Sequence, residues 1–285
     1  MTLKLADAST EYLKDKDLKK DDVITQWRVR LQTGGICFEV VPLAELQAIL
    51  FLQSCYYRNE AAKAAIDNFF TVKTHCPEFL QERNAMGKAV KAALDVAVFA
   101  TLPKKTPEGY TIFFTKLVDT NPNNYNLADS LKCFDMTCLL HLHQEGTSPG
   151  HVIIYDLQGV VFGHLARLGP LTIKKFLYYL QELDKLFALM RPFMKKELMK
   201  KFYMHNSVED LLQFIPRDCL PSDYGGTSDS ASVLHEQMKK KLRENLPFFA
   251  WEKKQTVDES ARPGKPKSLN DIFGVEGTFK KLELD

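Results

Sequence analysis

The stretch that decides the fold lies at residues 150–159 and reads Gly150-His151-Val152-Ile153-Ile154-Tyr155-Asp156-Leu157-Gln158-Gly159. Its unbroken apolar centre is typical of a parallel strand that is covered on both faces. Residues 110–118 are β-branched and aromatic over a strand length, which predicts a second strand. A turn at 121–126 and a helical pattern at 127–144 connect the two. The sequence therefore predicts a βαβ unit and an α/β fold.

Helical patterns flank this unit on both sides. Upstream, apolar residues recur at helical spacing over 43–55 and 61–75, and Pro77 closes the second pattern. Downstream, one long pattern covers 172–190, a shorter one covers 194–202 after Pro192, and another covers 232–246. Ser207 and Asp210 are placed to cap a short helix that stops before Pro216. We expect a helical module at 1–100, a sheet domain at 101–226, and a C-terminal helix and tail at 227–285.

Composition excludes several classes of protein. The chain has 285 residues with 38 Lys and Arg against 36 Asp and Glu, a net charge of +2 that argues against a large nucleic-acid-binding surface. No apolar stretch approaches the ~20 residues of a membrane span, and the N-terminus lacks the apolar core of a secretory signal. The six cysteines form no C-x-x-C pair, which favours free thiols in a reducing, cytoplasmic compartment.

No enzyme signature is found among the common nucleotide-binding, hydrolase and metalloprotease motifs. His141 and His143 lie two apart on a predicted helix and therefore point to opposite sides, so shared metal binding would require a strand there. We expect one of them to be packed and the other solvated. Asp156 ends a strand without a second acid or a histidine in its motif, which favours a structural role accepting backbone donors over catalysis. The sequence predicts no catalytic residue, no metal site and no cofactor.

A basic cluster covers residues 191–201, with five cations and one acid beside Phe193, Met194 and Phe202. Such a segment is able to lie on an anionic bilayer. An ordinary solvated helix face is the alternative interpretation.

Several motifs, jointly and in order, resemble the CRAL-TRIO lipid-transfer family, and most of all its alpha-tocopherol-transfer-protein-like members. They are the stretch at 150–159 with His164, Pro170 and Lys174-Lys175, then Arg191-Pro192-Phe193-Met194, then Leu220-Pro221-Ser222-Asp223-Tyr224-Gly225-Gly226. The helical stretch 46–78 looks like the family's N-terminal module. The resemblance implies a helical N-terminal module followed by a mixed, mostly parallel sheet with flanking helices and an apolar pocket.

The resemblance also implies a function without covalent chemistry, in which one hydrophobic small molecule is bound, and a gate helix at 183–202 opens at a membrane. By position in the motifs, the pocket is expected to be lined by Cys133, Thr137, Tyr155, Val160, Phe162, Leu165, Leu168, Phe176, Tyr179 and Leu180. On the gate helix, Phe187, Met190, Phe193 and Met194 are expected to face ligand or bilayer, and Lys196, Lys200 and Lys201 are the candidates for contact with a membrane or a phosphoinositide. Plain core packing is the alternative for each pocket residue.

The chain departs from the family pattern at two places. A strand of the pattern R-L-K-x-I-H-x-x-N-x-P is expected after Glu182, but Leu183 follows directly, so about twenty residues are missing. The basic R-F-L-R-x-R pattern of the N-terminal helix reads Leu50-Phe51-Leu52-Gln53-Ser54-Cys55. Loss of an interior strand should reduce burial of both sheet faces.

Two functions follow from these expectations. The first is a monomeric cytoplasmic carrier that binds a tocopherol-, retinoid- or phospholipid-like molecule and engages membranes peripherally. The second is a protein-interaction module that keeps the family's shell but has an impaired pocket. Neither involves nucleic acid.

Overall fold

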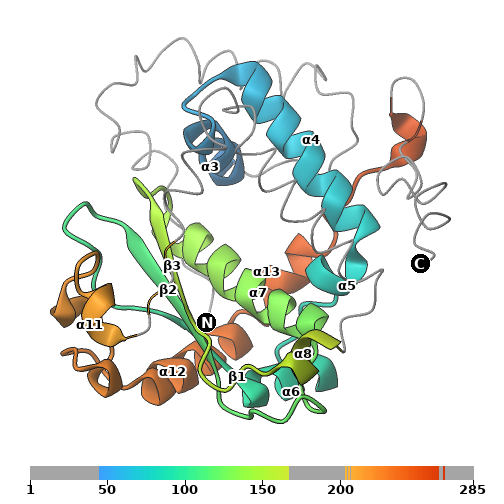
Figure 1. Ribbon diagram of the computed structural model, residues 1–285. Helices are drawn as coiled ribbons and strands as arrows, with labels where there is room; N and C mark the ends of the chain where they lie inside the picture. The colour runs from blue at the N-terminus through green and yellow to red at the C-terminus, as the bar shows by residue number, and fades with distance from the viewer. Residues whose placement is uncertain (1–44, 167–202, 204, 206, 263–265, 267–285) are drawn as a thin grey trace, which may run out of the picture.

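The computed structural model describes residues 45–166, 203, 205, 207–262 and 266 (Figure 1). Its sheet has the strands β1 (Ala97–Thr101), β2 (Thr111–Leu117) and β3 (His151–Asp156) in the order β1-β2-β3. β2 runs parallel to β3, with Phe113 opposite Ile153, as the βαβ pattern predicts. β1 pairs antiparallel with β2 and was not expected, because the sequence assigns residues up to 100 to the helical module.

Helices surround this sheet. They are α3 (Glu45–Ser54), α4 (Asn59–His75), α5 (Pro77–Leu80), α6 (Lys88–Val96), α7 (Leu127–Glu145), α8 (Phe162–Ala166), α11 (Val208–Leu211), α12 (Ala231–Glu244) and α13 (Leu246–Glu252), with single 3-10 turns at Arg217–Cys219, Ser222–Tyr224 and Glu259–Ala261. The helices expected at 43–55, 61–75, 127–144 and 232–246 are confirmed within a few residues. Pro77, however, also starts α5, because proline at a first helical position lacks only an N–H that the helix does not use.

Side chains at the ends of the helices explain why they start where they do. The Asn126 side chain accepts a hydrogen bond from the Asp129 N–H at 3.1 Å and caps α7, which ends at Glu145 and is followed by Gly146 with φ +76°. Ser207 Oγ accepts from the Asp210 N–H at 3.2 Å, so the expected cap of α11 is confirmed. The helix itself stops earlier than expected, at Leu211.

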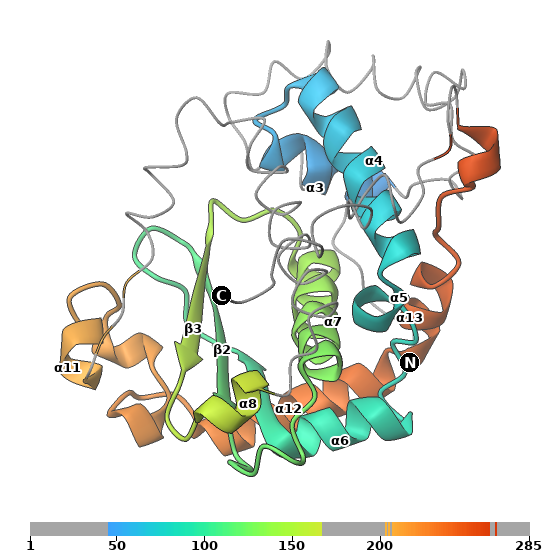
Figure 2. The ribbon, with the colours of Figure 1, turned by 45° about the vertical axis from the view of Figure 1, so that its right-hand side comes forward.

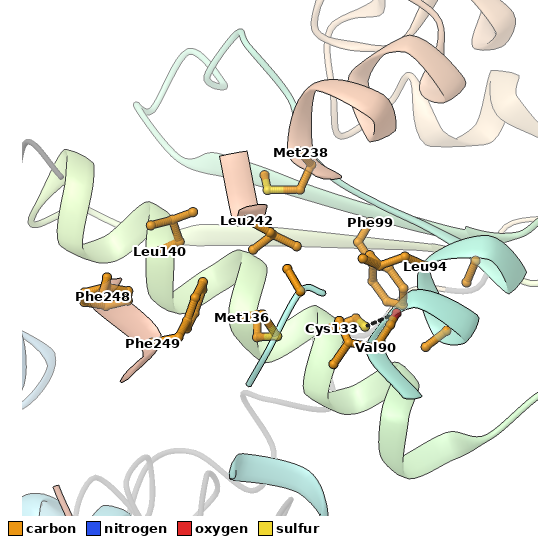
Figure 3. Close-up of a cluster of buried hydrophobic side chains, with 13 residues drawn as sticks. Val90, Leu94, Phe99, Cys133, Met136, Leu140, Met238, Leu242, Phe248 and Phe249 are labelled. Carbon is orange, nitrogen blue, oxygen red and sulfur yellow. Dashed lines mark hydrogen bonds between the residues drawn. The ribbon is translucent and has the colours of Figure 1, made fainter. Parts of the chain in front are cut away.

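The two faces of the sheet bury different clusters. On one side, α7 packs with α6, α12 and α13 around Phe99, Met136 and Leu242 (Figure 3). On the other side, the even-numbered residues of β1 and β2, such as Ile112 and Phe114, pack with residues from 208–234. Figures 1 and 2 show α7 and α11 on opposite sides of the sheet. The sheet is therefore the middle layer of the domain.

β3 corrects the expectation of a strand covered on both faces. Its residues alternate between half-buried and exposed, and Ile153 and Tyr155 keep 49% and 53% of their surface exposed. β3 is the edge strand, and among the described ranges no other strand pairs with its outer edge. The expected helices at 172–190 and 194–202 and the N-terminal 1–44 lie outside the described residues.

A buried ion network ties α13 to the N-terminal helices and to α7. The Glu252 carboxylate contacts Lys73 Nζ of α4 and Arg83 Nη1, each at 2.5 Å, and Arg83 also pairs with Asp135 of α7. The side chains of Lys73, Arg83 and Glu252 are 0%, 1% and 2% exposed. This network joins segments that are far apart in the sequence.

Candidate ligand-binding face

One face of the sheet, between the strands and α7, carries aromatic side chains, of which Phe113 is buried and Tyr155 remains half exposed. On β3, His151, Ile153 and Tyr155 share the side toward α7 because side chains alternate along a strand. Phe113 of β2 lies beside Ile153 on the same side. Phe134 of α7 contacts both strands, with ring centroids 6.2 Å from Phe113 and 5.7 Å from Tyr155.

α7 presents a single line of residues to these strands. Phe134, Cys138 and His141 are spaced at i, i+4 and i+7, which places them on one side of a helix. We call the set of Phe113, Phe134, Cys138, His141, His151, Ile153 and Tyr155 the aromatic face.

Two histidines stand at one end of the aromatic face, both against the ring of Phe113. His141 meets that ring edge-on at 5.5 Å, and His151 stacks on it at 5.6 Å. His141 Nε2 is 3.2 Å from the hydroxyl of Thr111. Burial lowers the pKa of His141 to about 4, with His151, Lys241 and Lys105 adding to the effect, and partial loss of solvent together with Lys105 lowers the pKa of the exposed His151. Both imidazoles are therefore neutral at pH 7.

The other end of the face is uncharged as well. Burial raises the pKa of the Cys138 thiol, and partial loss of solvent around the phenol of the half-exposed Tyr155 raises the pKa of that group as well. Neither side chain ionises at neutral pH. The aromatic face thus combines apolar contact area with neutral polar groups, which is the usual chemistry of a site for a small apolar molecule.

The expected pocket residues separate into three groups. Tyr155 belongs to the aromatic face, and Val160 and Phe162 are exposed in the loop and helix that follow β3. Cys133 and Thr137 are buried on the other side of α7, where Cys133 Sγ lies 3.7 Å from the Val90 carbonyl oxygen (Figure 3) and Thr137 Oγ1 donates to the Cys133 carbonyl oxygen. The remaining candidates lie outside the described side chains: Leu165, Leu168, Phe176, Tyr179, Leu180, Phe187, Met190, Phe193, Met194, Lys196, Lys200 and Lys201.

Sequence reasoning missed six members of the aromatic face: Phe113, Phe134, Cys138, His141, His151 and Ile153. The helical spacing within 127–144 indicates the members on α7, because residues 134, 138 and 141 lie on one side of a helix whereas residue 133 is turned away by about 100°.

His141 and His143 do point to different partners, as their spacing predicts. His143 is buried against Phe248, with Nδ1 2.8 Å from the Leu139 carbonyl oxygen. The expectation that one of the two is solvated is wrong, because His141 is half-buried against Phe113 and Thr111.

Asp156 holds the loop that follows β3. Its Oδ1 accepts from the Gln158 N–H at 2.9 Å, and the Tyr224 hydroxyl donates to Oδ2. The expected structural role is thus confirmed and extended to a second segment. His164 is buried, and its Nδ1 accepts from the Val161 N–H at 3.1 Å.

Within 45–166 and 207–262, no three His, Cys, Asp or Glu side chains are grouped as metal ligands. Among the described helices, none is both long and apolar enough to span a membrane. The five described cysteines, Cys55, Cys76, Cys133, Cys138 and Cys219, form no disulfide.

Comparison with known proteins shows similarity to a CRAL/TRIO domain model and to several curated relatives. A model of the CRAL/TRIO domain matches residues 182–226. The alpha-tocopherol transfer protein-like protein of Mus musculus is 26% identical over 204 residues, which cover 64% of this chain and 59% of the relative. Its Homo sapiens counterpart is 25% identical over 62% of this chain and 57% of the relative, and Clavesin-1 of Xenopus laevis is 21% identical over 62% and 59%.

The matched region thus spans less than two thirds of these relatives' own length. The mixed sheet with flanking helices agrees with the fold that the motifs imply. Taken together, the domain match and the relatives show that the chain is similar to proteins of the CRAL-TRIO family, and its mixed α/β fold is consistent with that similarity.

Proposed function

We propose that this protein binds one hydrophobic small molecule on the aromatic face and carries it between membranes. The observation that carries the proposal is the half-exposed state of Ile153 and Tyr155 on a face whose other members are aromatic or neutral. Exposed apolar surface of this kind is the usual mark of a binding site.

Burial of apolar surface on this face supplies enough free energy to bind a small lipid. Covering roughly 200 Å² of apolar surface contributes about 5 kcal/mol before the costs of association. A planar or branched lipid body has the area to reach both α7 and β3. Because apolar contacts select by shape, the face accepts several lipid classes, including tocopherol-, retinoid- and phospholipid-like molecules.

The membrane step of this proposal rests on the basic and apolar segment at 183–202. Phe187, Met190, Phe193 and Met194 would face ligand or bilayer, and Lys196, Lys200 and Lys201 would meet anionic headgroups. The names of the mouse and human relatives include a transfer activity, which supports this step. We expect a monomeric, non-enzymatic carrier that acts in the cytoplasm and associates peripherally with membranes.

A protein-interaction module is the second candidate function. The outer edge of β3 has no partner strand among the described residues, and Val161 and Phe162 just beyond it are 50% and 79% exposed. An open strand edge beside exposed apolar side chains is a template for pairing with another chain.

Native mass spectrometry of the purified 285-residue chain, before and after incubation with mixed-lipid vesicles, tests the first candidate. We expect one lipid mass per chain and movement of a fluorescent lipid from donor to acceptor vesicles. Ile153→Asp puts a charge on the aromatic face and should abolish both. Val233→Asp, at a side chain 46% exposed on α12, is the matched control and should change neither.

Folded wild-type protein that stays empty and transfers no lipid would contradict the carrier function. If the same empty protein forms a stoichiometric complex with a partner, and Phe162→Asp disrupts that complex, the interaction module is favoured. Equal losses in Ile153→Asp and Val233→Asp would show that binding does not involve the aromatic face.

A further inference from the structure

Residues 253–262, which follow α13, form a strap along the N-terminal helices. We propose that this strap holds α3 beside the turn that leads into β3, and that its release opens this end of the aromatic face and speeds the exchange of bound lipid. The inference rests on the proposed function where it concerns lipid. The domain match at 182–226 does not include the strap.

A buried pair of amides ties the strap to α3. Gln47 Nε2 donates to Gln255 Oε1 at 2.9 Å, and Gln255 Nε2 donates to Gln47 Oε1 at 3.0 Å. Gln47 is 5% exposed and Gln255 is 0% exposed. Hydrogen bonds are stronger at low dielectric, and the loss of one buried partner is costly for the other. The pair therefore fixes α3 against the strap.

The strap also follows α4. Val257 is buried in the apolar cluster of α3 and α4, and its N–H donates to Thr74 Oγ1 at 3.1 Å. Further along, Arg262 forms an ion pair with Asp67 at 2.9 Å and donates to Thr71 Oγ1 at 3.0 Å. Each of these contacts is made by a single side chain or N–H of the strap. A segment held in this way opens at a lower free energy than the packed core.

α3 in turn lies beside the turn that joins α7 to β3 (Figures 1 and 2). Gln53 Nε2, near the end of α3, donates to the Ser148 carbonyl oxygen at 2.8 Å. Ser148 Oγ donates to the Gly150 carbonyl oxygen at 2.8 Å, and His151 of the aromatic face follows directly. Movement of α3 away from this turn therefore changes access to the first residues of β3.

Hydrogen–deuterium exchange of the full-length protein tests the hold of the strap on α3. Gln255→Leu removes both hydrogen bonds to Gln47, so the amides of Glu45–Ser54 should exchange roughly five- to hundredfold faster while α12 stays protected as in wild type. Gln47→Leu combined with Gln255→Leu should exchange no faster than either single variant, because the two amides act on each other.

Two variants elsewhere in the strap complete the test. Arg262→Gln removes the ion pair with Asp67 and leaves the buried amides intact, so it decides the matter if Gln255→Leu fails to fold. We expect exchange in α3 to rise about two- to fivefold in Arg262→Gln, because the strap loses one of its several attachments. Lys254→Gln changes an exposed side chain beside Gln255 and should leave the exchange of α3 unchanged.

Passage of retinol from loaded protein to phosphatidylcholine vesicles, followed by retinol fluorescence, tests the effect on lipid exchange. The rate constant should rise at least about fivefold in Gln255→Leu, because opening of α3 then requires less free energy. It should stay at the wild-type value in Lys254→Gln.

Unchanged exchange of α3 in both Gln255→Leu and Arg262→Gln, or an equal increase in α12, overturns the proposal, because the strap then does not hold α3 in particular. Faster exchange of α3 with an unchanged retinol rate also overturns it and leaves the carrier function intact. If the wild-type protein takes up neither retinol nor any lipid from mixed vesicles, the proposed function fails, and the role of the strap in lipid exchange fails with it.

Discussion

Glu252→Gln is expected to destabilise the protein strongly, because this carboxylate is the centre of the buried ion network. Its two oxygens neutralise Lys73 and Arg83 at 2.5 Å, and the three side chains are at most 2% exposed. The isosteric amide keeps the volume but leaves the two cations with Asp135 as their one remaining anion in the network. Breaking a buried pair from one side costs about 3–5 kcal/mol, which for a chain of this length corresponds to a fall in melting temperature of roughly 5–8 °C.

The pH dependence of this loss gives a second signature. Burial lowers the pKa of Lys73, and Glu252 opposes that shift. Without the carboxylate the pKa of Lys73 falls further, so the folded variant binds fewer protons than its unfolded chain at alkaline pH. The free energy of unfolding of the variant therefore rises with pH in that range, and its deficit against wild type should be smaller at pH 9 than at pH 7.

Urea denaturation followed by circular dichroism measures both effects. The matched control is Glu82→Gln, which breaks the 2.6 Å ion pair between Glu82 and Lys253. These two residues adjoin Arg83 and Glu252 in the sequence, but both of their side chains are exposed. We expect no measurable change in the midpoint of Glu82→Gln. Equal midpoints for Glu252→Gln and Glu82→Gln, or a deficit that does not shrink at pH 9, would refute the reasoning.

Three further predictions concern single sites. Gly226→Ala should cost about 2–4 kcal/mol in thermal unfolding, because an added Cβ would lie 1.8 Å from the Leu220 carbonyl oxygen. Tyr224→Phe removes the hydrogen bond to Asp156 and should lower stability by about 1–2 kcal/mol, measured by the urea midpoint. Lowering the pH from about 6.5 to about 4 should reduce stability, because the unfolded chain protonates His141 first; His141→Gln should flatten this dependence in urea titrations at each pH.

Local sequence patterns were sufficient for the central unit of the fold. The apolar run of β3, the β-branched pattern of β2 and the helical spacing between them predict a parallel pair with α7 as the connection, and the structure has both. Capping by Ser207 and the structural role of Asp156 were also predictable, because each depends on donors within three residues along the chain.

β1 was not predictable from its own residues. Ala97–Thr101 continues the alanine-rich pattern of α6, and alanine favours helix. The strand forms because Phe99 and its neighbours pair with β2, whose residues lie more than ten positions further along the chain. A partner at that separation overrides local propensity. The same dependence on distant partners explains why the ion network of Lys73, Arg83 and Glu252 could not be predicted from the sequence.

The family resemblance and the helical spacing of α7 select different residues for the candidate site. Motif position selects Cys133 and Thr137, whereas the structure turns those side chains toward the core and presents Phe134, Cys138 and His141 to the strands. The apolar run of β3 predicts two covered faces, yet the described protein leaves Ile153 and Tyr155 half exposed. An apolar side chain kept at an open face has no role in solubility and gains nothing from water. Its presence is accounted for when something apolar covers it, and the neutral, aromatic surroundings on α7 and β2 are suited to a lipid.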